Sequence, residues 1–162
     1  LNKNSIGIEI TNPGHRFNYK KFSKKQISSL LKLTKFLIKI YKISHKNILG
    51  HSDISPERKK DPGEKFPWEY FSKNGVGLWH TVKKQELIKN RTIKITKIER
   101  KLFFNSVFRM GYPKRFIKVS SKERYLNYII KAFQRRYRQA LINGKIDREC
   151  LLISQNLMKK LN

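Results

Sequence analysis

The chain has 162 residues, enough for one well-packed core or two small ones. It carries 38 Lys and Arg residues against 11 Asp and Glu, a formal net charge of +27, and its apolar runs are too short for a transmembrane helix. The basic residues are spread along the whole chain instead of forming one stripe. Drift in an AT-rich genome explains this spread better than a nucleic-acid or anionic-surface partner does, and we expect no nucleic-acid partner.

Residues 5–10 alternate Ile6, Ile8 and Ile10 with smaller or polar residues. This period of two predicts a β-strand with one buried face, and it places Glu9 on the face opposite the isoleucines. A polar loop with a proline and a glycine follows over residues 11–22.

Ser23 and Gln26 have the spacing of a capping box, which predicts the start of a long helix that continues to Tyr41. Apolar residues recur at intervals of three and four along this helix and form a stripe. The lysines lie largely off that stripe, so we expect them in solvent and the apolar stripe against a sheet.

Residues 47–49 are expected to form a short buried strand that presents His51 at its carboxyl end, the usual place for ligands in open α/β sheets. Pro67 predicts a helix from Trp68 to Lys73, which Asn74 and Gly75 end. The two tryptophans, at positions 68 and 79, suit a core better than a sugar-binding platform.

Residues 81–97 have no clear period and are interpreted as a linker. Helical patterns follow from Ile98 to Met110 and from Tyr125 to Tyr137, and Asp147 can cap a third helix that runs to Leu161. Three amphipathic helices with short loops predict a small bundle. The single cysteine, Cys150, falls within the third helical pattern and is expected to be a packing residue.

The loop over residues 50–63 contains His51, Lys59 and Asp61 together with two prolines and two glycines. Proline restricts φ and glycine permits positive φ, so this composition suits a rigid, shaped loop. Five of the 11 acidic residues fall between positions 53 and 69. They are either solvated turn residues or part of a metal or catalytic loop, because histidine and carboxylate are ordinary zinc ligands.

A family resemblance favours the second alternative. Residues 50–68 read GHSDISPERKKDPGEKFPW and resemble the GHSDIAPxRKxDPGxxFPW segment of zinc-dependent N-acetylmuramoyl-L-alanine amidases of type 2, which are related to peptidoglycan recognition proteins. Residues 5–9 (SIGIE) and 12–15 (NPGH) match further family segments, so the resemblance covers about residues 1–80. Farther along, GYP at 111–113, AFQRRYR at 132–138 and GKID at 144–147 resemble a peptidoglycan-binding helical module.

The resemblance implies an α/β fold with a mixed sheet and flanking helices, lacking its first strand or strands and followed by a small three-helix domain. Residues 1–80 would be the carboxyl-terminal portion of the amidase domain, 81–97 a linker, and 98–162 the peptidoglycan-binding-like domain. The arginines at 135, 136 and 138 then belong to packing motifs instead of a nucleic-acid surface.

The resemblance also implies a zinc hydrolase that cleaves the amide bond between N-acetylmuramic acid and L-alanine in peptidoglycan or muropeptides. Zn²⁺ would be the cofactor, and His51 and Asp61 correspond to two of the three protein ligands. Lys59 corresponds to a residue that stabilises the oxyanion, and Glu9 to the general acid/base. The remaining candidates, both for substrate binding, are Asn12 and His15, although His15 also suits a solvated loop. We expect a monomer, and a periplasmic or secreted location is favoured over a cytoplasmic one.

One departure from the family is clear. The first zinc ligand of these amidases is a histidine in an IVIHYT-like strand, and nothing of that kind is present here. The chain is therefore either the carboxyl-terminal portion of a longer amidase or a peptidoglycan-binding remnant that lacks activity.

Overall fold

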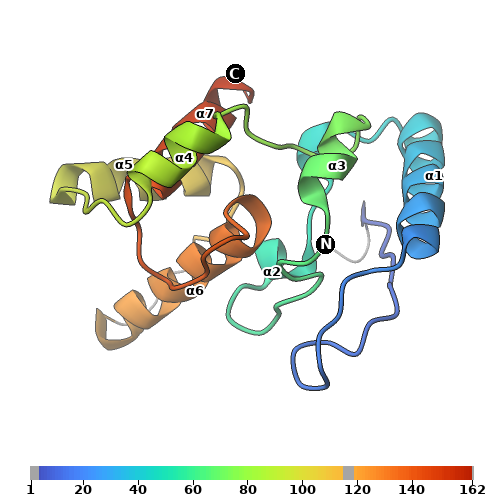
Figure 1. The fold of residues 1–162 in the computed structure, drawn as a ribbon, viewed down its shortest axis with the longest axis horizontal. Helices are drawn as coiled ribbons and strands as arrows, with labels where there is room; N and C mark the ends of the chain where they lie inside the picture. The colour runs from blue at the N-terminus through green and yellow to red at the C-terminus, as the bar shows by residue number, and fades with distance from the viewer. Residues whose placement is uncertain (1–3, 115–118, 162) are drawn as a thin grey trace.

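The computed structural model describes residues 4–114 and 119–161, and within them the chain forms seven α-helices and one 3₁₀ turn. Two lobes are visible in Figure 1, one built on α1 (Lys24–Tyr41) and α3 (Trp68–Lys73), the other on helices closer to the carboxyl terminus. The four-residue helix α2 (His51–Ile54) lies where the lobes meet. Nothing in these described ranges is long and apolar enough to cross a bilayer.

The expected mixed sheet is wrong, because no β-strand occurs in the described residues. Residues 5–10 and 47–49, both predicted as strands, belong to neither a helix nor a strand, apart from Asn47, which ends the 3₁₀ turn His45–Asn47. A strand needs a neighbour that accepts and donates its ladder hydrogen bonds, and an alternating sequence supplies only the face pattern. Ile6 and Ile8 accordingly remain 49% and 38% exposed.

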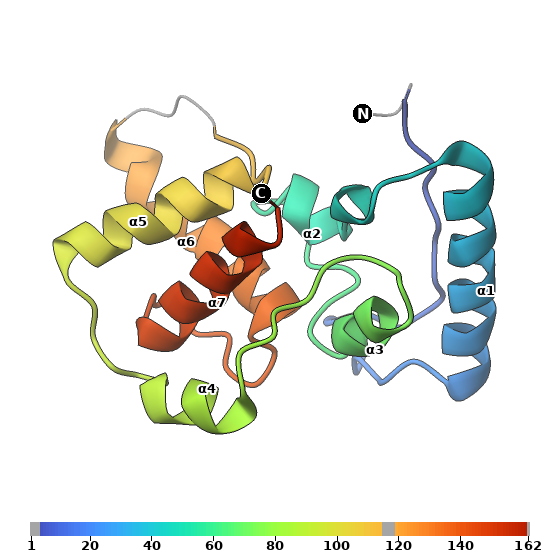
Figure 2. The same ribbon diagram turned by 90° about the horizontal axis from the view of Figure 1, so that it is seen from above.

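Helix α1 begins and ends where the sequence predicts. The Ser23 hydroxyl accepts from the Gln26 backbone N–H at 3.2 Å, and the Ser23 N–H donates to the Gln26 side chain at 2.9 Å, which completes the capping box. Lys42 ends the helix in the left-handed conformation with φ of 49°. Figure 2 shows the segment before the helix running beside it.

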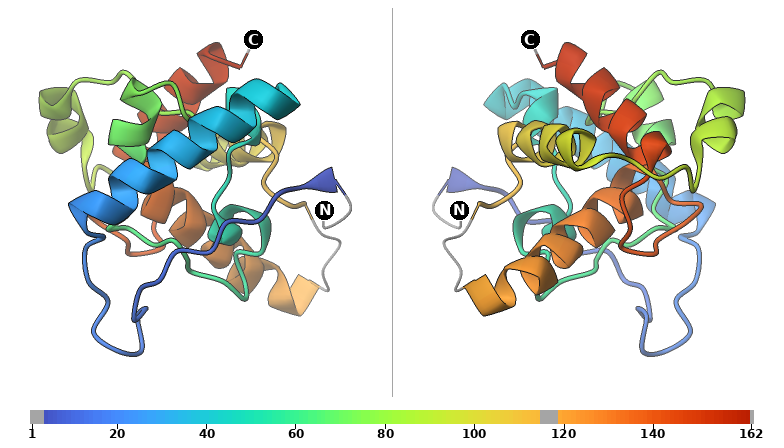
Figure 3. Two further views of the ribbon diagram at one scale, coloured as in Figure 1. Left: turned by 90° about the vertical axis from the view of Figure 1, so that its right-hand side faces the viewer. Right: turned by 90° about the vertical axis from the view of Figure 1, so that its left-hand side faces the viewer.

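The apolar stripe of α1 packs against Phe66, Trp68, Phe71 and Val76, and Leu31 of α1 is part of the same buried cluster. Phe36, Ile40 and Tyr41 on the same helix remain more than half exposed. The helix therefore covers this aromatic cluster, not the sheet that its pattern led us to expect. Figure 3 shows α1 in front of the first lobe in its left view, and α5–α7 in front in its right view.

The second lobe contains α4 (Lys84–Asn90), α5 (Lys97–Arg109), α6 (Val119–Tyr137) and α7 (Arg148–Lys159). The last three occupy the three segments with helical patterns, and α4 lies inside the segment interpreted as a linker, packed against α7. Their core includes Phe103, Val107, Ile129, Phe133 and Leu157, all fully buried. Trp79 is partly buried against this core and against the aromatic cluster of the first lobe, so it packs in the interior between them.

Buried charges in the second lobe are paired. Arg138 bonds to Asp147, and Arg91 makes two 2.8 Å bonds to the Glu149 carboxylate. Asp147 also accepts from the Cys150 backbone N–H at 3.0 Å and so caps α7. Burial raises the pKa of the Cys150 thiol to about 12, in agreement with a packing role.

Candidate metal-binding loop

The loop between Gly50 and Gly63 closes tightly on itself. A Cβ added to Gly50 would lie 2.8 Å from Pro62 Cδ and 3.2 Å from Trp68 Cζ2, so no other residue fits there without displacement. Gly63 has φ of 83° and approaches the Tyr19 hydroxyl in the same way. The shaped loop that the composition predicted is therefore present.

Tyr19 ties this loop to the segment before α1. Its hydroxyl donates to the Pro62 carbonyl at 2.7 Å and accepts from the Lys65 N–H at 2.9 Å. Burial raises the pKa of Tyr19 to about 12, so the hydroxyl stays protonated to a higher pH than that of a free tyrosine.

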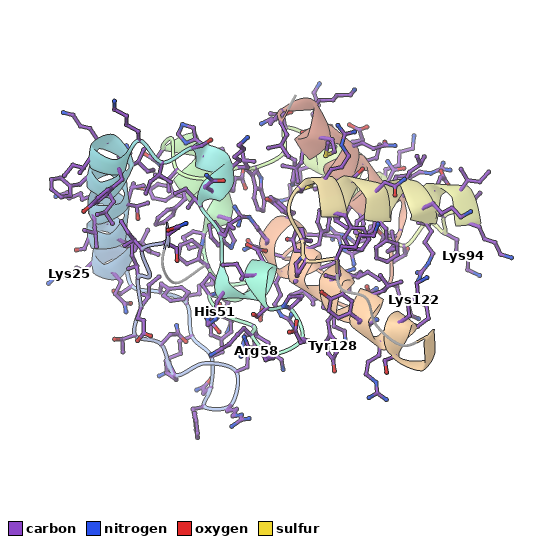
Figure 4. All side chains as sticks on the ribbon, turned by 180° about the vertical axis from the view of Figure 1, so that it is seen from behind. Lys25, His51, Arg58, Lys94, Lys122 and Tyr128 are labelled. Atoms are coloured by element: carbon purple, nitrogen blue, oxygen red, sulfur yellow. The ribbon has the colours of Figure 1, made fainter. Side chains whose placement is uncertain are left out.

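The structure brings the two sequence-predicted metal ligands together. His51 Nδ1 lies 3.0 Å from Asp61 Oδ2, and their side chains are 46% and 61% exposed. The backbone holds the pair as well, because the Ser52 N–H donates to the Asp61 carbonyl at 2.9 Å. Figure 4 shows His51 at the start of α2, with Arg58 farther along the same loop and Tyr128 on the neighbouring α6.

Two adjacent donors of this kind suit zinc. Bonds of about 2.0–2.2 Å to a tetrahedral ion place two ligand atoms roughly 3.3–3.6 Å apart, slightly more than the 3.0 Å of this hydrogen-bonded pair. An imidazole nitrogen and a carboxylate oxygen are also chemically appropriate. The described residues nevertheless contain no group of three His, Cys, Asp or Glu side chains placed to hold one ion, whereas catalytic zinc sites use three protein ligands.

Lys59 and Lys60 differ in their surroundings. The backbone N–H of Lys59 donates to the Ser55 carbonyl at 2.9 Å, and the residue is half-buried, whereas Lys60 is exposed. Arg58, one residue earlier, donates to the Ser55 hydroxyl at 3.0 Å. Lys59 is therefore the lysine of this pair that the folded loop constrains.

Glu9, the sequence-predicted acid/base, is exposed, and within the described part of the chain it makes no hydrogen bond or ion pair with His51 or Asp61. Because residues 5–10 form no strand, the alternation that was to orient Glu9 does not set its direction here.

Asn12 and His15, the two candidates for substrate binding, both contact protein groups. The Asn12 amide donates to the Lys20 carbonyl and its oxygen accepts from the Gly14 N–H, each at 3.0 Å. His15 stacks on Tyr19 with centroids 4.4 Å apart, and its Nε2 lies 3.1 Å from Glu64. Asn12 thus shapes its own loop, and His15 fastens that loop to Glu64, directly after the candidate metal-binding loop (residues 50–63).

The sequence reasoning missed a buried polar cluster behind the loop. Asp53, two residues after His51, is 5% exposed and bonds to Arg136 and Tyr112 from the second lobe. The available signal was the position of Asp53 as the third residue of a helix preceded by glycine, where a carboxylate can cap the helix start.

Comparisons with known proteins agree with this local structure. A family model described as N-acetylmuramoyl-L-alanine amidase matches residues 1–64. The chain is 32% identical over 165 residues to the N-acetylmuramoyl-L-alanine amidase AmiD of Escherichia coli K12, covering 99% of this chain and 59% of AmiD. It is 44% identical over 68 residues to the 1,6-anhydro-N-acetylmuramyl-L-alanine amidase AmpD of Haemophilus influenzae, covering 41% of this chain and 35% of AmpD.

Two solved structures are also similar to this chain. The complex of E. coli AmiD with the substrate anhydro-N-acetylmuramic acid-L-Ala-D-γ-Glu-L-Lys matches with a TM-score of 0.74 and 31% identity, over 89% of this chain and 55% of that one. AmpDH3 from Pseudomonas aeruginosa matches with a TM-score of 0.71 and 26% identity, over 89% of this chain and 56% of that one. The chain spans less than two thirds of each of these relatives. Over the aligned residues the chain is similar in sequence and in fold to N-acetylmuramoyl-L-alanine amidases of type 2.

Proposed function

We propose that this chain forms part of a zinc-dependent amidase that hydrolyses the bond between N-acetylmuramic acid and L-alanine in muropeptides or peptidoglycan. The observation that carries the proposal is the exposed His51–Asp61 pair, 3.0 Å apart in the loop that matches the family. The complex of AmiD with an anhydro-muramyl peptide supports this substrate class. Because peptidoglycan lies outside the cytoplasmic membrane, we also propose a periplasmic or secreted location.

In this mechanism His51 and Asp61 would hold Zn²⁺ as two of its ligands. Bound zinc would supply a water nucleophile of low pKa and polarise the scissile carbonyl. The Ser52–Asp61 backbone bond joins the two main-chain segments that carry His51 and Asp61, and the two side chains face each other through their own 3.0 Å hydrogen bond.

Lys59 is the proposed oxyanion donor. A compact ammonium on a constrained loop can stabilise negative charge that develops on the carbonyl oxygen. The half-buried position of Lys59, next to the exposed Lys60, supports the choice of position 59. Glu9 is the proposed proton acceptor, on its family position alone. It has to come within about 2.6–3.2 Å of the attacking water, a distance reached in many enzymes only when substrate binds.

The test is a cleavage assay on the full-length gene product with N-acetylmuramoyl-L-Ala-D-γ-Glu-L-Lys, followed by mass spectrometry. We expect release of free N-acetylmuramic acid and the intact tripeptide, loss of cleavage with a chelator, and recovery with zinc. His51→Ala should abolish cleavage, whereas His45→Ala, at an exposed histidine on the 3₁₀ turn, should retain it. Cleavage at another bond, or undiminished cleavage by His51→Ala, would contradict the proposal.

A second candidate is a peptidoglycan-binding protein without catalysis. The observation that favours it is that the described residues supply two metal donors instead of three. This alternative predicts that the full-length protein sediments with purified peptidoglycan but releases no peptide at any zinc concentration. Zinc-dependent release of the tripeptide would exclude it.

A further inference from the structure

The Asp53 carboxylate supports the turn that carries His51. Asp53 Oδ2 accepts from the Gly50 N–H at 2.8 Å, which caps the first residue of the turn. Helix α2 has only four residues, and a helix of that length is not stable by itself in water. Gly50 has no side chain with which to cap the helix, so the position of His51 depends on Asp53.

Asp53 is held in turn by two residues of the second lobe. Arg136 Nη1 donates to Asp53 Oδ2 at 2.5 Å, and the Tyr112 hydroxyl donates to Oδ1 at 2.8 Å. All three residues are more than nine-tenths buried. Burial and the nearby carboxylate raise the pKa of Tyr112 well above its ordinary value, in agreement with a hydroxyl that donates to Asp53.

Arg136 forms hydrogen bonds to the chain on both sides of His51. Its Nη2 donates to the Ile48 carbonyl at 2.7 Å, three residues before His51, while Nη1 bonds to Asp53, two residues after it. The guanidinium also stacks over Trp68 at 4.2 Å from the ring centre. A planar guanidinium with several donors can make these contacts at once, whereas a lysine ammonium cannot match them.

We infer that Arg136 and Tyr112 are positioning residues for the metal-binding loop, which they control through Asp53. The inference rests on the proposed function, since it assigns the second lobe a role at the zinc site. Groups that orient metal ligands commonly contribute about 10–100-fold to metal affinity. The second lobe would therefore raise the affinity of the loop for zinc by holding His51 in place.

The chain offers matched controls for both residues. Arg138 is as buried as Arg136 and also pairs with an aspartate, Asp147, but the whole pair lies within the second lobe. Tyr125 is buried like Tyr112 and its hydroxyl donates to the Pro113 carbonyl at 2.7 Å, away from Asp53. Substitution of Arg138 or Tyr125 should disturb the fold to a similar extent without reaching His51.

The test is zinc affinity of the full-length protein, measured by competition with a fluorescent chelator at a temperature where circular dichroism shows every variant folded. Arg136→Met should weaken zinc binding about 10–100-fold, and Arg138→Met should stay within about twofold of wild type. Tyr112→Phe, the milder change, should weaken binding measurably while Tyr125→Phe does not. Arg136→Lys should restore part of the loss, since it keeps the charge but not the second bond.

Zinc binding by Arg136→Met and Tyr112→Phe at the wild-type level would overturn the inference and leave the proposed function intact. Equal losses in the Arg138→Met control would also overturn it, because the effect would then be general destabilisation. A wild-type protein that binds no zinc would overturn the proposed function and this inference with it.

Discussion

Replacement of Gly50 by alanine tests the close packing of the candidate metal-binding loop. The new Cβ would meet Pro62 Cδ at 2.8 Å, Trp68 Cζ2 at 3.2 Å and Asp53 Oδ2 at 3.4 Å. The first two atoms belong to rings that cannot rotate away, so the backbone has to shift. Overpacking of this kind costs about 1–3 kcal/mol.

Part of that cost is offset in the unfolded chain, where alanine has less conformational freedom than glycine. The gain is about 0.4–1 kcal/mol, which leaves a net loss of about 1.3 kcal/mol for Gly50→Ala at the middle of both ranges. In a chain of this size that corresponds to a fall in Tm of roughly 3–5 °C. Gly7→Ala is the matched control, since nothing lies within 4 Å of its Cβ and its φ is not positive.

Thermal unfolding followed by circular dichroism measures both variants. We expect Gly7→Ala to be unchanged or slightly more stable than wild type, and Gly50→Ala to be less stable. Zinc affinity should fall in Gly50→Ala as well, because displacement of Pro62 moves the neighbouring Asp61. Equal stability of the two variants would refute the argument that the loop needs glycine at position 50 for lack of space.

Three other predictions follow from single side chains. Lys59→Met should lower kcat about 10²–10³-fold with zinc content unchanged while Lys60→Met costs little; equal losses in steady-state assays would refute the assignment. Burial lowers the pKa of His80, so the unfolded state binds the proton more readily and the free energy of unfolding should fall as pH drops below about 6.5. Urea unfolding at several pH values between about 5 and 7.5 should show that the free energy of unfolding depends less steeply on pH in His80→Leu than in wild type. The same pH dependence in both proteins would exclude His80 as the cause. Cys150, fully buried with its pKa raised to about 12, should resist Ellman's reagent at pH 8 until denaturant is added, and rapid labelling of the native protein would contradict its burial.

Helix ends and tight loops were predictable because their signals are local. The Ser23–Gln26 capping box fixed the start of α1, and Pro67 with Asn74 and Gly75 bounded α3 at the residues observed. The sheet was not predictable in the same way, because pairing depends on a partner segment that the pattern of residues 5–10 does not contain. Helix α4 has little periodicity of its own and is stabilised by packing on α7.

In the candidate site, too, contacts within one loop were predictable from the sequence and contacts between distant segments were not. His51 and Asp61 are ten residues apart in one loop, and the family resemblance, not the loop composition, led us to expect them as ligands of one ion. Arg136 reaches Asp53 across 83 residues of sequence. No repeat, spacing or composition links two such positions, so their contact appears only once the two lobes are packed together.

The central claim is that His51 and Asp61 hold one zinc ion, and the zinc content of the Asp61→Ala protein tests it most directly. Full-length wild type, Asp61→Ala and the control Glu64→Ala would be loaded with zinc, desalted and analysed by mass spectrometry for metal per chain. Glu64 contacts His15 and not the His51–Asp61 pair. We predict about one zinc per chain in wild type and Glu64→Ala and almost none in Asp61→Ala. A full complement of zinc in Asp61→Ala would contradict the claim.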